Sequence, residues 1–171
     1  MKAGRRAWLL LALACGLATV WQPGWARAPV PDWFWAQVVS VTDGDTLRVQ
    51  AEQGLVAIRL AGIDAPERKQ AFGRRSREHL RQLAMGEAVL VAPRKRDRYG
   101  RWVAQVFVGG TDVGLAQVRG GWAWHYTAYA REQPAQEAAL YQAAEEAARE
   151  GRAGLWRDPD PVPPWEFRRR R

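Results

Sequence analysis

Cysteine and histidine are both scarce in this sequence of 171 residues. The only cysteine, Cys15, lies near the N-terminus, so we expect a mature protein without disulfides. A chain of this length can form one domain with a hydrophobic core of its own and needs no covalent staples. His79 and His125 have no histidine three or four residues away, so the sequence does not indicate a histidine-based metal site.

Long hydrophobic runs are missing as well. The apolar run Trp8–Ala14 follows a basic start and precedes a Pro23-Gly24 break, and it is too short to cross a bilayer as a membrane helix. This arrangement is typical of a secretory signal peptide, here residues 1–26, with cleavage after Ala26. We therefore expect a secreted or periplasmic protein that keeps no stable membrane span after processing.

Two other fates of the N-terminal segment remain open. A small residue precedes Cys15, which allows a lipoprotein, although Ala12 stands where a larger aliphatic residue is usual. The segment could also stay uncleaved as an anchor. Cleavage after Ala28 is disfavoured because Pro29 follows it.

The expected domain also lacks a strong excess of charge. The whole chain has 26 basic and 18 acidic residues and a net charge of +8. Residues 1–26 hold three basic residues and no acidic one, which leaves +5 for the remainder, and Arg168–Arg171 account for four of these charges. Basic character is thus local, in patches and in the C-terminal tail.

Alternating and helical hydrophobic patterns divide the rest of the chain. Residues 27–35 read as an extended leader, residues 36–157 as the folded domain, and residues 158–171 as an extended or disordered tail rich in proline and arginine. The predicted strands are Ala36–Val41, Thr46–Ala51, Leu55–Ala61, Ala88–Ala92 and Arg101–Val108. The predicted helices are Phe72–Met85, a short helix from the Asp112 cap to Arg119, and Ala135–Glu150 with Leu140, Ala144 and Ala147 on its buried side. These patterns predict a small mixed barrel or an open sheet.

Three polar turns stand at the ends of these strands. They are Asp43-Gly44-Asp45, the stretch Leu60–Glu67 with Arg59 before it, and Asp97-Arg98-Tyr99-Gly100-Arg101. Together they supply hard oxygen ligands for a divalent cation, a spare carboxylate and two guanidinium groups, which phosphodiester hydrolysis requires. By itself, Asp43-Gly44-Asp45 would be an ordinary turn, and it lacks the later acidic positions of an EF-hand.

These motifs and their order resemble the thermonuclease family, the calcium-dependent nucleases typified by staphylococcal nuclease. The resemblance covers residues 36–156. It implies a mainly β protein with α additions, namely a five-stranded oligonucleotide-binding (OB) barrel with about three helices.

The resemblance also implies a Ca²⁺ site and its ligands. Asp45 and Asp64 would bind the ion together with the backbone carbonyl of Ala65, and substrate phosphate or water would complete the shell. The family commonly has threonine where Ala65 stands. A backbone contact should tolerate alanine.

Three further residues match the catalytic groups of the family. Glu67 would act as general base or orient the attacking water, and Arg59 and Arg101 would hold the phosphate. Assistance by Arg59 to the departing 5′ oxygen implies products that end in a 3′-phosphate. Each of these residues could instead have a purely structural role. Glu67 could stabilise the N-terminus of the following segment, where negative charge is favoured, and arginines on strands are usually solvated surface groups.

Substrate contacts are expected from Arg98, Tyr99, Tyr126 and Tyr129. Tyr99 resembles a family tyrosine that contacts the terminal phosphate. Tyr129, or else Tyr126, matches a tyrosine that stacks on a base. The neighbouring Trp122 and Trp124 could equally be core residues.

The substrates implied are DNA and RNA, cut by a monomeric endonuclease. A different possibility is a catalytically inactive OB-fold module that binds nucleic acid or protein. Asp45, Arg59, Asp64, Glu67 and Arg101 are all present, whereas an inactive module would be expected to have lost at least one of them.

Overall fold

A computed structural model describes residues 32–170, so the predicted signal peptide lies outside the described residues. The strands are β1 (Phe34–Val41), β2 (Thr46–Ala51), β3 (Gly54–Leu60), β4 (Ile63–Asp64), β5 (Ala88–Arg96), β6 (Trp102–Val108), β7 (Thr111–Asp112) and β8 (Trp124–His125). The helices are α1 (Gly73–Ala84), α2 (Val113–Arg119), α3 (Ala135–Glu150) and α4 (Pro164–Arg169), with 3₁₀ turns η1 (Thr127–Glu132) and η2 (Gly154–Arg157).

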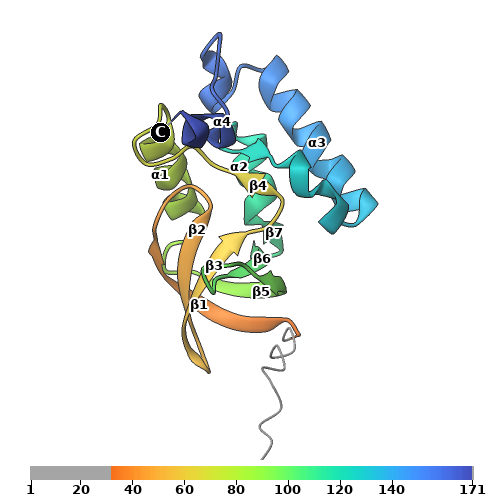
Figure 1. Cartoon of the computed structure of the whole chain (residues 1–171). Coiled ribbons are helices and arrows are strands. Elements are labelled where there is room, and N and C mark those ends of the chain that lie inside the picture. The colour runs from red at the N-terminus through yellow and green to blue at the C-terminus, as the bar shows by residue number, and fades with distance from the viewer. Residues whose placement is uncertain (1–31, 171) are drawn as a thin grey trace, which may run out of the picture.

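Five main strands form a closed barrel (Figure 1). Antiparallel pairing gives the order β3-β2-β1-β5-β6, and β3 then pairs in parallel with β6. The parallel register places Ile58 opposite Trp102 and Leu60 opposite Ala104. This pairing settles the question that periodicity left open, and the mixed five-stranded barrel with three main helices confirms the predicted OB fold.

Strand alternation explains the core. In β2, Leu47 and Val49 are fully buried while Arg48 and Gln50 point outward, as the period of two requires. The corresponding residues of the other strands fill the barrel with aliphatic side chains, chiefly Val38, Ile58, Leu60, Val89, Val91, Ala104 and Val106.

The three predicted helices are present; α1 and α2 pack against barrel strands, and α3 packs on α2. The side chain of Asp112 caps α2 by accepting hydrogen bonds from the backbone N–H groups of Gly114 and Leu115. The predicted buried side of α3 is wrong in part. Tyr141, Ala144 and Ala148 are buried, whereas Leu140 is 58% exposed and Ala147 is exposed as well. The Tyr141 hydroxyl donates to Asp112, and that polar anchor turns the helix toward the tyrosine.

The end of the chain is not an extended tail. Pro163 is the N-cap and Pro164 the first residue of α4, positions where the fixed φ of proline favours a helix start. Trp165 then packs against Trp124, with ring centroids 6.4 Å apart. In Figure 1, α4 lies between α1 and α3, close to β4. None of the helices within residues 32–170 has the length and apolar character to cross a membrane.

Candidate active site

All ten predicted site residues line one cavity of about 690 Å³. They are Asp45, Arg59, Asp64, Ala65, Glu67, Arg98, Tyr99, Arg101, Tyr126 and Tyr129. The cavity lies where β2, β3 and β6 begin or end, beside β4 and η1. The structure therefore brings the three polar turns together, although their roles in catalysis remain predictions.

Strand pairing sets the positions of the two aspartates. Asp45 directly precedes β2, and the antiparallel register puts its neighbour Thr46 opposite Arg59 of β3. After Gly62, whose φ of +75° suits glycine, the chain enters β4, where Asp64 pairs with Trp124 of β8. The carboxylates of Asp45 and Asp64, which are far apart in the sequence, thus lie close together.

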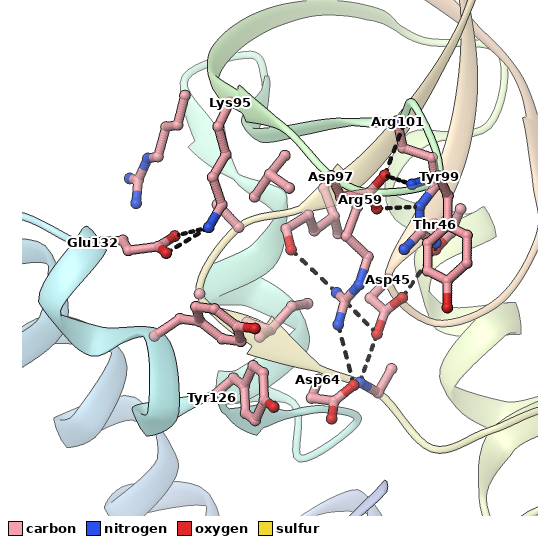
Figure 2. Close-up of a pocket in the computed structure, with 18 of the residues that line it drawn as sticks. Asp45, Thr46, Arg59, Asp64, Lys95, Asp97, Tyr99, Arg101, Tyr126 and Glu132 are labelled. Carbon is pink, nitrogen blue, oxygen red and sulfur yellow. Dashed lines mark hydrogen bonds and ion pairs between the residues drawn. The ribbon is translucent and has the colours of Figure 1, made fainter. Parts of the chain in front are cut away.

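Arg59 lies between these carboxylates (Figure 2). Its Nη1 is 3.1 Å from Asp45 Oδ2, and its Nη2 is 3.1 Å from Asp64 Oδ1. Both aspartates are almost fully buried, at 7% and 1% exposure. Burial of two like charges is costly without a counter-charge, so the guanidinium stabilises the pair.

The acidic turn is further ordered by its own hydrogen bonds. Asp45 Oδ2 accepts the backbone N–H of Ala65 at 2.7 Å, and Asp45 Oδ1 accepts the Thr46 hydroxyl at 3.0 Å. Burial, followed by the neighbouring Asp45, raises the pKa of Asp43 to about 7. Burial also raises the pKa of Asp64 above its usual value, against the opposing effect of its arginine partners.

These oxygens fit a hard divalent cation. Two carboxylates lie close together beside the Ala65 backbone, and the Arg59 guanidinium pairs with both of them. Within residues 32–170 no group of three or more His, Cys, Asp or Glu side chains is placed to hold a metal ion. Any cation here would thus depend on two carboxylates, backbone oxygen and substrate, which make an open site of oxygen ligands alone.

Arg101 is positioned by Asp97. The Asp97 carboxylate accepts the Arg101 Nε at 2.7 Å, together with the backbone N–H groups of Tyr99 and Arg101. Partial burial works against ionisation, but these hydrogen bonds prevail and lower the pKa of Asp97. The Arg101 Nη1 is 3.3 Å from the Thr46 hydroxyl, so both predicted phosphate-binding arginines reach the same acidic turn.

The aromatic wall of the cavity consists of two tyrosines. Tyr126 and Tyr129 have ring centroids 5.1 Å apart, and Lys95 Nζ lies 4.9 Å from the Tyr129 centroid. Trp124, by contrast, is a core residue at 4% exposure, as the structural alternative held. Arg98 and Arg101 both lie over the ring of Tyr99, which is 68% exposed.

Four basic residues of the cavity were missed by sequence reasoning. Arg94, Lys95 and Arg96 continue β5 beyond its predicted end, and their run before Asp97 was the available signal. Arg168 of α4 also lines the cavity. It binds Asp64 and Glu67, and only the arginine run of the tail hinted at it.

Sequence reasoning also missed Gln117 of α2, which holds the Asp43-Gly44-Asp45 turn in place. Its buried amide donates to the carbonyl of Gly44 at 2.6 Å and to that of Ser76 at 3.1 Å. Gln117 thus ties the acidic turn to both α1 and α2.

We expect Gln117→Leu to lower the free energy of unfolding by about 2 kcal/mol, because two buried carbonyls lose their donor. The nuclease activity that the family resemblance implies should fall about tenfold as the Asp45 turn loosens. Urea denaturation and an activity assay measure the two effects. Gln105→Leu is the matched control, since Gln105 bonds Asp112 outside the cavity. Equal activities in the two variants would refute a positioning role for Gln117.

Comparison with known proteins agrees with this geometry. Residues 57–158 match the family described as staphylococcal nuclease homologue. The chain is 42% identical over 136 residues to an "Uncharacterized endonuclease" of Escherichia coli O157:H7, covering 79% of this chain and 85% of that protein. It is 40% identical over 151 residues to a "Micrococcal nuclease" of Shigella flexneri, covering 82% and 84%. It is also 37% identical to "Protein ParB" of Escherichia coli, covering 96% and 94%.

Proposed function

Because the chain belongs to the staphylococcal nuclease family and is a nuclease, we propose that it performs a Ca²⁺-dependent cleavage of single-stranded or frayed DNA and RNA. The observation that carries this proposal is the convergence of Asp45 and Asp64 on Arg59, in one cavity with Glu67 and Arg101. These are hard oxygen ligands, a candidate base and two phosphate-binding groups within reach of one another.

Asp45, Asp64 and the Ala65 carbonyl would hold the calcium ion. An ion held by these oxygens would supply positive charge that offsets the charge of a substrate phosphate. The threonine hydroxyl of other family members is not needed for a backbone contact, so alanine at position 65 is compatible with this role.

The protein's own side chains supply the remaining chemistry. Glu67, 38% exposed at its side chain, can take a proton from the attacking water. Arg59 and Arg101 would donate hydrogen bonds to the phosphate oxygens and stabilise the extra negative charge of the five-coordinate transition state. Donation by Arg59 to the departing 5′ oxygen would leave products that end in a 3′-phosphate.

Stacking explains the expected preference for unpaired substrates. A nucleobase can stack on Tyr126 or Tyr129 only when it is not paired and stacked within a duplex. Aromatic rings discriminate little between the different bases. Lys95 beside Tyr129 and Arg98 beside Tyr99 would add backbone contacts without sequence specificity.

Export to the periplasm or the medium is part of the proposal. It rests on the basic start and short apolar run of residues 1–26, which the described residues do not include. The proposed enzyme acts as a monomer.

The proposal is tested by the release of acid-soluble nucleotides from heat-denatured DNA, with Ca²⁺ and then with a chelator. We expect activity only with Ca²⁺, and a loss of about 10³-fold in Glu67→Ser, because general-base catalysis contributes on the order of 10²–10⁴. Glu87→Ser is the matched control, since Glu87 lies outside the cavity.

Two results would contradict the proposal. Activity that resists the chelator would mean a different mechanism. DNA binding without hydrolysis in any divalent ion would leave the non-catalytic OB-fold module.

A further inference from the structure

Helix α4 places the guanidinium of Arg168 against the carboxylates of Asp64 and Glu67, which the proposed reaction needs unpaired. The Arg168 guanidinium grips Asp64 with both terminal nitrogens, Nη2 at 2.7 Å from Oδ2 and Nη1 at 3.2 Å from Oδ1. The same Nη1 is 2.9 Å from Glu67 Oε1. One side chain thus engages the predicted calcium ligand and the predicted base together.

The same helix also covers a base-stacking position. Trp165 stacks on Tyr126 with ring centroids 5.4 Å apart and planes 24° apart, the geometry that a nucleobase would adopt. Its edge-on contact with Trp124 adds a second anchor.

The segment that leads into α4 is fixed to the catalytic loop. Gln70 donates its side-chain amide to the carbonyl of Val162 at 2.6 Å and accepts the backbone N–H of Glu67 at 3.0 Å. The helix is therefore docked at three points around the cavity.

We propose that α4 is an autoinhibitory cover, in which Arg168 competes with calcium for Asp64 and Trp165 competes with a nucleobase for Tyr126. The proposal rests on the proposed function. Both competitors belong to one helix of six residues, so calcium and an unpaired base act against the same docked state.

The balance of forces allows displacement. The Arg168 side chain remains 44% exposed, so water screens its ion pairs and weakens them. Polyanionic substrate offers phosphates to Arg168, Arg169 and Arg170 as alternative partners for the released helix. If α4 leaves the Ca²⁺ site open for only a fraction of the time, the apparent affinity for Ca²⁺ is lowered by that fraction.

The test is calorimetric titration of Ca²⁺ into the full chain without nucleic acid. Arg168→Ala should bind Ca²⁺ about tenfold more tightly than the wild type. Arg169→Ala is the matched control. It removes the same charge from the same helix, but Arg169 forms no ion pair within residues 32–170, so the Ca²⁺ affinity of this variant should stay within about twofold of the wild-type value. Trp165→Ala changes no charge and should still tighten binding about threefold, because it weakens α4 docking alone. Circular dichroism verifies that each variant is folded.

The outcomes separate this proposal from the proposed function. Equal Ca²⁺ affinities in the wild type and Arg168→Ala would overturn the cover while leaving a calcium site. Weaker binding in Arg168→Ala would also overturn it, since α4 would then support the site. No Ca²⁺ binding by any variant would overturn both proposals.

Discussion

Arg59→Ala is expected to lower kcat/KM by about 10⁴-fold, within the range reported for a single arginine that stabilises phosphoryl-transfer charge. The reason is double. The variant loses a donor to the phosphate, and it loses the cation that holds Asp45 and Asp64 at 3.1 Å on either side. Kinetics on denatured DNA at saturating Ca²⁺ measure the effect.

Stability should change as well, and calcium should affect it. Without Arg59, buried Asp45 loses its ion pair and Asp64 keeps the one with Arg168, which should destabilise the metal-free protein by about 3 kcal/mol. Because Ca²⁺ can replace the lost charge, it should raise the Tm of Arg59→Ala more than that of the wild type.

Arg48→Ala provides the matched control. Arg48 lies on the adjacent strand β2 and points into solvent, so its removal should change neither kcat/KM nor Tm appreciably. A variant Arg59→Ala that keeps more than a tenth of the wild-type activity would refute the role of Arg59 in phosphate binding.

Gly44→Ala is expected to lower the free energy of unfolding by about 3 kcal/mol, at the upper end of overpacking effects, and activity by about 100-fold. A methyl group at this position would lie 1.8 Å from Ser76 Oγ and 2.7 Å from Ala65 Cβ. Ser76 is fully buried in α1, and Ala65 is held by its hydrogen bond to Asp45. The turn must therefore shift, and Asp45 shifts with it.

A double-mutant cycle tests that explanation. Ser76→Gly removes the contact at 1.8 Å, and the Ser76 hydroxyl has no hydrogen-bond partner among the described residues, so little else is lost. In the Ser76→Gly background, Gly44→Ala should cost clearly less stability than in the wild type. Equal costs in both backgrounds would show that the clash with Ser76 is not the cause.

Local signals account for the parts of the fold that the sequence predicted. Asp112 before an apolar helical pattern predicted α2 and its cap, and alternation predicted β2 with the observed bounds. The residues that line the cavity were predictable for the same reason, since each polar turn holds them within a few positions of one another, while their roles stay predictions. The resemblance to a known family then supplied the distances between turns that local patterns cannot provide.

The features that were missed depend on contacts between distant segments. Tyr141 rather than Leu140 faces the core because its hydroxyl reaches Asp112, 29 residues away. Gln117 looks like any polar helix residue until its bond to the Gly44 carbonyl, 73 residues away, is known. Arg168 reaches Asp64 across 104 residues, and composition indicated only an unstructured basic tail.

The parallel pairing of β3 with β6 has a consequence for the safety of the producing cell. Arg59 meets Asp45 through the antiparallel β2–β3 pairing, but Arg101 stands just before β6 and reaches the acidic turn only when β6 has joined β3 and the barrel has closed. Such a non-local pairing forms late, after the loop between the strands has been ordered. If the proposed export carries the chain across the membrane unfolded, the complete site would not be assembled while the chain is among the nucleic acids of its own cytoplasm.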